Sequence, residues 1–241
     1  MTIDARYPCN ATSEPAPMTA QQVWRVAEHV RRQMTPRPNL ARLDLESVVQ
    51  RAPGLRVNGT DIVIHWDLER RILDGEGREA LGVTEADAAL PGALLISLNA
   101  DLIAERDYLK RSTLAHELGH VVFDGPSMLR QSGKPAFAMV TPDEAHLETA
   151  VRGRSGMDWR EFRANEFMGA LLVPRALLQR EIVRRAAGFG LALRDIGSGV
   201  GALRKRSDPH RIEGLLIDLA ERFGVSATFI ECRLNRYGLV H

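Results

Sequence analysis

Residues 111–122 read RSTLAHELGHVV, and they decide how the rest of the chain is interpreted. The stretch contains His116 and His120 four positions apart, with Glu117 directly after the first histidine. Four residues of α-helix turn about 400°, so both imidazoles lie on one face and can reach a single metal ion at about 2.0–2.1 Å. Glu117 is rotated about 100° from His116, which suits a general base beside the metal. The pattern H-E-x-x-H therefore predicts a metal site with an acid–base group next to it.

The residues around this motif are apolar, and they predict that its three polar side chains are buried. The flanking side chains are aliphatic: Leu114, Ala115, Leu118, Val121 and Val122. Burying three ionisable groups without partners is costly, and a shared metal ion accounts for all three together. The competing interpretation is a pair of surface histidines beside a solvated glutamate. The apolar context favours the metal site.

A catalytic zinc site needs a third protein ligand, and Glu161 is the preferred candidate. It lies in a predicted helix over residues 159–172, where Asn165 shares its face one turn later and can support the metal ligands. The competing interpretation is that Glu161 only completes a capping box with Asp158, three residues earlier. The rival candidates for the third ligand are Glu166, His146 and Glu148.

Hydrophobic periodicity and helix breakers predict an α+β fold. A small β-sheet is expected to pack on the helices that carry the metal ligands. The predicted helices cover residues 19–34, 44–51, a segment capped by Asn99 or Asp101 that ends near 122, 159–172, and two segments of 212–239 broken at Gly224. The predicted strands cover residues 62–66 and 93–98, with an exposed acidic loop between them.

The chain is expected to divide into three parts. Residues 1–18, rich in proline and small polar residues, predict a flexible N-terminal arm. Residues 19–175 predict the metal-binding domain, and residues 176–241 a C-terminal helical, helix-turn-helix-like subdomain. Residues 124–157 predict a long loop inside the first domain. Long loops inside compact domains are usually functional or disordered.

Composition excludes several classes of protein. The 241 residues are 44% hydrophobic and 26% charged, as in ordinary globular proteins, and the net charge of +1 predicts no polyanionic partner. Aromatic residues make up 5%, which argues against a platform that stacks nucleic-acid bases. Cys9 and Cys232 are too few for a disulfide scaffold or a cysteine zinc ribbon. The sequence shows neither a long apolar run nor a signal peptide, so we expect no membrane contact and a cytoplasmic location.

Two blocks of the chain are similar to a known family: residues 111–120, RSTLAHELGH, and residues 161–174, EFRANEFMGALLVP. They resemble the active-site helix of the ImmA/IrrE-type zinc metallopeptidases and that family's pattern E-x-E-A-N-x-F-A-x-x-L-L-M-P. The resemblance covers residues 44–239. The chain departs from the family at Arg163 and Met168, and in the long loop.

The resemblance implies a zinc metallopeptidase domain over residues 19–175. His116, His120 and Glu161 would bind Zn²⁺, and Glu117 would be the catalytic base. Two imidazoles and a carboxylate also suit Mn²⁺. The family implies an endopeptidase that cleaves a helix-turn-helix repressor and so relieves repression of stress or mobile-element genes. The sequence identifies no substrate-binding residue. The candidates for an additional oxyanion donor are His146, Tyr108 and Tyr237.

The C-terminal segment suggests a function of another class, DNA binding by a transcriptional regulator. Four residues have helix-turn-helix spacing: Ala220, Gly224, Val225 and Ile230. Arg204-Lys205-Arg206 could contact phosphates, but the expected recognition helix, residues 228–237, contributes only Arg233 and Arg236 as basic groups. We therefore favour a helical hairpin that packs on the core. A non-catalytic zinc scaffold is a third interpretation, and Glu117 argues against it because a scaffold needs no base.

Overall fold

The structure is a computed structural model, and it divides the chain into two units. The first comprises Met1–Pro38 and Asp44–Leu171, and the second Asn39–Leu43 and Leu172–His241. The predicted boundary after residue 175 differs slightly from this division and misses the short segment that joins the second unit. The structure describes residues 3–35, 37, 39–52, 54–73, 77–86, 89–104, 106–130, 137–140, 158–195, 201–203 and 208–240.

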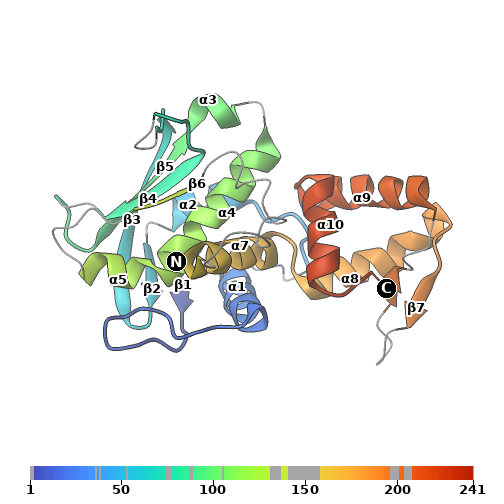
Figure 1. The fold of residues 1–241 in the computed structure, drawn as a ribbon, viewed down its shortest axis with the longest axis horizontal. Coiled ribbons are helices and arrows are strands. Elements are labelled where there is room, and N and C mark those ends of the chain that lie inside the picture. Colours follow the sequence, from blue (N-terminus) through green and yellow to red (C-terminus); the bar gives the residue numbers. More distant parts are fainter. Residues whose placement is uncertain are drawn as a thin grey trace. The chain divides into compact units, whose positions relative to one another are not determined.

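The first unit contains a mixed β-sheet (Figure 1). In the described residues it has six strands in the order β1-β2-β3-β5-β4-β6. β1 is parallel to β2 and β3 is parallel to β5, whereas the other neighbours are antiparallel. The strands are β1 (Ile3–Ala5), β2 (Gly54–Val57), β3 (Thr60–Arg70), β4 (Gly82–Ala86), β5 (Ala93–Asn99) and β6 (Phe137–Val140).

Helices accompany the sheet without regular alternation, which confirms the predicted α+β class. They are α1 (Ala20–Met34), α2 (Leu45–Arg51), α3 (Ala100–Ile103), α4 (Asp107–Phe123), α5 (Gly125–Arg130) and α7 (Trp159–Leu172). α1, α2 and α7 agree with the predicted helices. α1 begins with a capping box, in which Thr19 and Gln22 exchange hydrogen bonds. No helix in the described ranges is long and apolar enough to cross a membrane.

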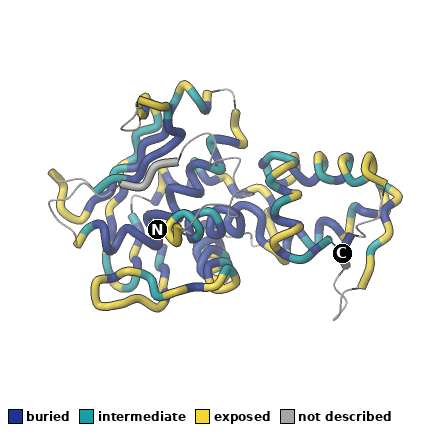
Figure 2. Tube along the Cα trace, in the orientation of Figure 1, coloured by how far each residue is buried: buried dark blue, intermediate teal, exposed yellow. Residues whose placement is uncertain are grey.

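One face of the sheet forms the core of the first unit. Side chains alternate along each strand, so Ile64 of β3 and its neighbours Leu94 and Ile96 of β5 point to the same face. These three residues are at most 5% exposed, and α4 and α5 contact the strands that carry them. Figure 2 shows this buried layer of strands and helix. On the opposite face Val63 is 47% exposed, as in a sheet with one solvated side.

The prediction of a flexible arm at residues 1–18 is wrong for the part that the structure describes. β1 adds a strand to the sheet, with Ile3 opposite Leu55 and Ala5 opposite Val57. Ile3 and Ala5 are at most 1% exposed. The composition of residues 1–18 does not predict this strand, because its hydrogen-bonding partner β2 lies some fifty residues later in the chain.

Tyr7 ties the N-terminal segment to the end of α4. Its hydroxyl donates to the carbonyl oxygens of Val122 at 2.7 Å and Phe123 at 3.2 Å. Its ring also packs on the ring of Phe123, with 5.0 Å between centroids. The last carbonyls of a helix lack partners within the helix, so the Tyr7 hydroxyl supplies a donor at this end, mainly to Val122.

The predicted helix from Asn99 or Asp101 to residue 122 is two helices, α3 and α4. Asn99 precedes α3, but its side chain forms no capping bond. The Asn99 amide instead donates to the carbonyl oxygens of Ile72 at 3.3 Å and Ala80 at 3.0 Å. The side chain therefore holds the segment before β4 against the sheet, a contact that helix-capping rules do not foresee.

Two segments predicted as loops contain regular structure. β4 lies within the expected acidic loop, and its residues Val83 and Thr84 are at most 3% exposed. Within the expected long loop, residues 125–130 form α5 and residues 137–140 form β6, which pairs with β4. The other residues of that loop from 131 onward lie outside the described ranges. These elements are short, so their sequences carry little periodicity.

The second unit is mainly helical. Its last two helices follow the predicted pattern, with a break at Gly224, whose φ of 68° is left-handed and favours glycine, whereas α8 and η1 were not predicted. The two-stranded β7–β8 ladder was not predicted. The elements are α8 (Arg175–Arg185), the 3₁₀ helix η1 (Ala186–Phe189), β7 (Leu193–Asp195), β8 (Gly201–Leu203), α9 (Pro209–Phe223) and α10 (Ala227–Arg236).

The N-terminal docking predicts a measurable effect on stability. Tyr7→Phe should lower the free energy of unfolding by about 1–3 kcal/mol, because it leaves buried carbonyl oxygens without their donor. Denaturant unfolding would measure the change. Arg6→Ala is the control, because the Arg6 side chain is 79% exposed and should matter little. Equal stability of Tyr7→Phe and the parent protein would mean that this segment does not pack as described.

Candidate metal centre

α4 and α7 bring the three predicted ligands together. His116 and His120 lie one turn apart on α4, and Glu161 lies in the first turn of α7. The two histidine Nε2 atoms are 3.0 Å apart, and each lies 3.3 Å from a different carboxylate oxygen of Glu161. One ligand atom from each residue lies within 4.8 Å of the others, so the group could hold a metal ion.

The cluster is buried, which excludes the interpretation as solvated surface histidines. His116 is 3% exposed, and Glu117 and His120 are fully buried. Only the Glu161 side chain keeps appreciable exposure, at 27%. The cluster therefore meets solvent on the side of α7.

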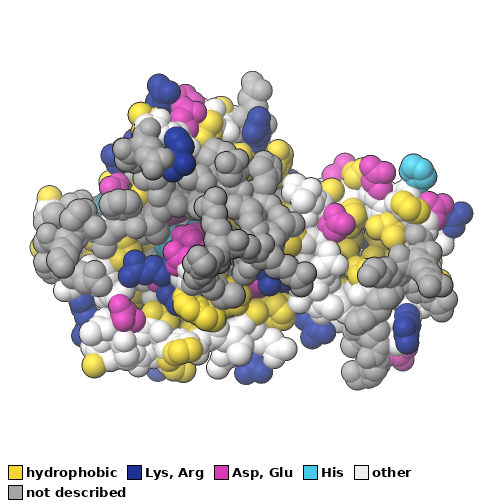
Figure 3. All heavy atoms as spheres, in the orientation of Figure 1, with side chains coloured by type: hydrophobic (Ala, Val, Ile, Leu, Met, Phe, Trp, Pro, Cys, Tyr) yellow, Lys and Arg dark blue, Asp and Glu magenta, His cyan; other side chains and the backbone are white. Residues whose placement is uncertain are grey.

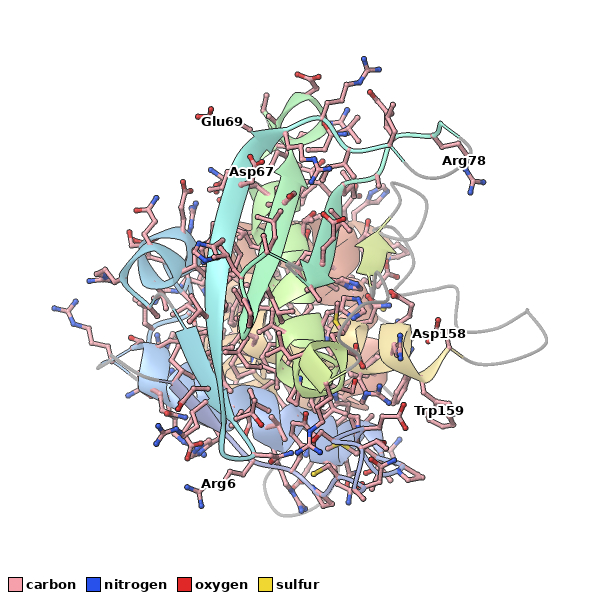
Figure 4. All side chains as sticks on the ribbon, turned by 90° about the vertical axis from the view of Figure 1, so that its left-hand side faces the viewer. Arg6, Asp67, Glu69, Arg78, Asp158 and Trp159 are labelled. Atoms are coloured by element: carbon pink, nitrogen blue, oxygen red, sulfur yellow. The ribbon has the colours of Figure 1, made fainter. Side chains whose placement is uncertain are left out.

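Glu161 faces the histidines instead of completing a capping box. Asp158 alone caps α7, because its Oδ1 accepts from the backbone N–H of Arg160 at 2.8 Å and of Glu161 at 3.4 Å. Figure 4 shows Asp158 and Trp159 pointing outward at the start of this helix. The Glu161 carboxylate is thus left to the two imidazoles.

Gly119 allows α4 and α7 to approach closely. A Cβ atom at position 119 would lie 2.9 Å from the Cα atom of Ala164 and 3.2 Å from its carbonyl oxygen. Real Cβ atoms do not come so close to backbone, so a larger residue would force the helices apart. Gly119 precedes His120, and Ala164 follows Glu161 by less than one turn. This contact therefore sets the distance between the acidic ligand and the imidazoles.

Each imidazole is held in place at its Nδ1 atom. His116 Nδ1 lies 3.0 Å from Asn165 Oδ1, and His120 Nδ1 lies 2.8 Å from Asp124 Oδ2. Arg163 donates from Nη2 to the other oxygen of Asp124 at 2.8 Å. Hydrogen bonds of this kind orient metal-binding imidazoles and set their tautomer.

These contacts direct both Nε2 atoms into the cluster. An ionised Asp124 only accepts hydrogen bonds, so Nδ1 of His120 carries a proton. Asn165 Oδ1 is also an acceptor, which assigns the second Nδ1 proton to His116. Two neutral imidazoles would then turn Nε2 lone pairs toward each other at 3.0 Å and repel. A proton or a metal ion between them removes this repulsion.

The surrounding charges favour a cation at this point. Burial lowers the pKa of His120, but the hydrogen bonds to Asp124 and Glu161 outweigh burial and raise it to about 10. Burial also raises the pKa of Asp124 and of Glu161, yet the histidines beside them hold both pKa values below their usual range. The protein thus stabilises positive charge where the three ligand atoms meet.

Glu117 is bonded to β4 and not to the three ligands. Its Oε2 accepts a hydrogen bond from the Thr84 hydroxyl at 2.7 Å, and its Oε1 is buried and has no hydrogen-bond partner in the described part of the chain. Burial raises the pKa of the Glu117 carboxyl, against the lowering effect of the two histidines. A buried carboxyl with a raised pKa and one free oxygen is suited to accept and release a proton.

The other residues that the sequence suggested, as a third metal ligand, as an oxyanion donor or as a phosphate contact, have other partners, are exposed or lie outside the described residues. Glu166 is buried and accepts a hydrogen bond from the Trp24 indole at 2.6 Å. Tyr108 is 42% exposed, and Tyr237 donates to the Val173 carbonyl oxygen at 2.9 Å within the second unit. The candidates outside the described ranges are His146, Glu148 and Arg204-Lys205-Arg206.

Sequence reasoning missed three residues of the site. Asp124 could have been found, because it follows His120 by four positions and so shares its helix face. In the sequence Arg163 stands out only as a departure from the family pattern, whereas the structure pairs it with Asp124. Thr84 gave no signal, because its segment was predicted as an exposed loop.

No protein-family model matches the chain, and no curated protein is significantly similar to it. The assignment of the site therefore rests on its geometry. Two imidazole nitrogens and one carboxylate oxygen are a donor set that divalent metal ions accept.

Metal binding is expected to depend on pH. The cation must replace a proton on His120, whose pKa of about 10 keeps that proton bound at neutral pH. The apparent affinity for Zn²⁺ should therefore rise about tenfold per pH unit between pH 6 and 9. Competition with a chelator at several pH values would measure it. Asp124→Asn should weaken binding by about 10–100-fold and flatten this dependence. A pH-independent affinity in the parent protein would contradict the assignment.

The helix contact gives a second prediction. Gly119→Ala should destabilise the protein by about 1–3 kcal/mol and lower its metal affinity, because the new Cβ meets Ala164. Helix propensity alone predicts the opposite sign, a stabilisation of up to about 1 kcal/mol. Thermal unfolding and metal analysis would measure both effects. Gly188→Ala is the matched control, because its new Cβ would meet no packed neighbour within 4 Å in the described part of the chain. Unchanged metal affinity in Gly119→Ala would refute the proposed spacing role.

Proposed function

We propose that the chain is a zinc-dependent endopeptidase. The observation that carries the proposal is the convergence of His116, His120 and Glu161 beside a separately held carboxyl, Glu117. Two imidazoles and one carboxylate are the donor set of several hydrolytic zinc sites, and three protein ligands leave a position for substrate or water. The same donors suit Mn²⁺, so either ion could serve.

The chemistry divides between the ion and the protein. A bound zinc ion would supply a Lewis acid that polarises a peptide carbonyl and makes water more acidic. Glu117 would take a proton from the attacking water and return it to the leaving amine. Asn165 and Asp124 would keep the imidazoles oriented, with Arg163 holding Asp124 in turn.

The proposed substrate is a helix-turn-helix repressor, whose cleavage would relieve repression of stress or mobile-element genes. This part rests on the resemblance of residues 111–120 and 161–174 to the ImmA/IrrE family. The surface offers no argument for a polyanion instead. On the described parts of the face in Figure 3, acidic and basic side chains are interspersed, and the net charge is +1.

DNA binding by the second unit has less support. The two helices around Gly224 are present, but α10 exposes Glu231 in its middle and buries Arg233 to 1% exposure. An exposed carboxylate at the centre of a recognition helix would repel phosphates. Absence of a salt-dependent mobility shift on DNA at low salt would exclude this function.

Two substitutions test the proposed function. Glu117→Gln should retain zinc but lose at least about a hundredfold in cleavage, because an amide cannot serve as the base. His116→Ala should lower the zinc content, because it removes a ligand. The test substrate would be a helix-turn-helix repressor, preferably one encoded beside the protein's own gene, with zinc added and products identified by mass spectrometry.

Two exposed residues provide controls, since His210→Ala and Glu231→Gln should change neither zinc content nor cleavage. Full cleavage by Glu117→Gln would reject the assignment of the base. A stable complex of the parent protein with the repressor, without cleavage, would indicate a scaffold instead of an enzyme.

A further inference from the structure

We propose that Thr84 of β4 is a positioning residue that orients the Glu117 carboxylate and leaves Oε1 as the atom that carries the transferred proton. The inference deepens the proposed function and rests on it. It starts from the 2.7 Å hydrogen bond that the Glu117 side chain accepts at Oε2 from Thr84 Oγ1.

The sheet register brings Thr84 to Glu117. Thr84 lies opposite Ile96 of β5, and Gly82 lies opposite Leu98, so both β4 residues face the buried side of the sheet. α4 contacts β4 along this side. Thr84 and Glu117 are both fully buried. The hydroxyl therefore does not compete with bulk water for the carboxylate, and the bond constrains the side chain strongly.

The hydrogen bond distinguishes the two carboxylate oxygens. A threonine hydroxyl has one proton, and Thr84 donates it to Oε2. Oε1 is buried and has no hydrogen-bond partner among the described residues. A proton taken up by Glu117 is therefore bound most favourably at Oε1. The same atom then passes the proton to the leaving amine. Oε2 therefore anchors the Glu117 carboxylate, and Oε1 transfers the proton.

Gly82 provides the space for that second oxygen. A Cβ atom at position 82 would lie 2.7 Å from Glu117 Oε1 and 2.8 Å from Thr113 Cγ2. Any side chain at this position would press on Oε1 or displace it. The two β4 residues therefore act on opposite oxygens of the same carboxylate, one through a hydrogen bond and one through an absent side chain.

Thr84→Val and Thr84→Ser test the inference, because valine keeps the shape and removes the hydroxyl, whereas serine keeps the hydroxyl. The matched control is Thr113→Val. Thr113 is also a buried threonine, but its hydroxyl donates to the Leu109 carbonyl oxygen of its own helix. Zinc content and thermal unfolding should be the same for Thr84→Val and for this control.

Two readouts would follow the zinc-loaded variants. The first is cleavage, in which Thr84→Val should lower kcat about tenfold or more at unchanged KM, and Thr84→Ser should restore it. The second is calorimetric binding of acetohydroxamic acid, a metal chelator whose proton a neighbouring carboxylate can accept. Thr84→Val should weaken this binding about tenfold, and Thr84→Ser should bind as the parent does.

The outcomes separate this inference from the proposed function. If Thr84→Val binds hydroxamate more weakly than the parent protein, but the parent protein cleaves no peptide, the positioning role is supported and the peptidase function is refuted. Cleavage and hydroxamate binding by Thr84→Val at parental levels would overturn the positioning role and leave the peptidase standing. Equal losses in Thr84→Val and Thr113→Val would also overturn it, because they would reflect a general packing defect. A parent protein that binds neither zinc nor hydroxamate would overturn both.

Discussion

The close approach of α4 and α7 at Gly119 and Ala164 is the constraint on which the candidate metal centre depends. The helix geometry of α4 is enough to align His116 with His120, but the acidic ligand comes from a different helix. α7 delivers Glu161 to the imidazoles, and the same helix supplies Asn165 and Arg163 for their support. One backbone contact between two small residues thus fixes the distance for several polar interactions at once. A larger side chain at this contact would loosen all of them together, which is why packing and chemistry are inseparable here.

β4 has the complementary role on another side of α4. The H-E-x-x-H helix is buried along most of its length, so each polar group on it needs a partner from a neighbouring element. Asn165 and Asp124 meet the histidines, and Thr84 meets Glu117. Among the described residues of this helix, Glu117 Oε1 is a buried oxygen without a hydrogen-bond partner. Other buried polar atoms of the described residues also lack a partner, such as Ser97 Oγ. The position of Glu117 Oε1 next to the candidate metal ligands is what supports its proposed part in proton transfer.

The sequence predicted what local spacing determines. His116 and His120 share a helix face by their separation alone, and Glu161 with Asn165 does the same on α7, so these four residues could be named before the structure was known. What depends on distant pairing was missed. β1 lies in a proline-rich segment and becomes a strand only through β2, and Thr84 reaches Glu117 through a β4 that local composition assigned to a loop. Asp124 is an intermediate case. Its spacing from His120 can be read from the sequence, but its ion pair with Arg163, which holds it against His120, comes from a distant helix. Short strands gain their stability from neighbours, and a single sequence does not display those neighbours.

The central claim is that His116, His120 and Glu161 bind one metal ion together, and X-ray absorption spectroscopy of the zinc-loaded protein tests it most directly. The account predicts one zinc per chain with only nitrogen and oxygen ligands at about 2.0–2.2 Å. It also predicts outer-shell scattering from two imidazole rings, which His116→Ala should reduce to one. Sulfur ligands at about 2.3 Å, or a zinc ion surrounded by oxygen alone, would contradict the account.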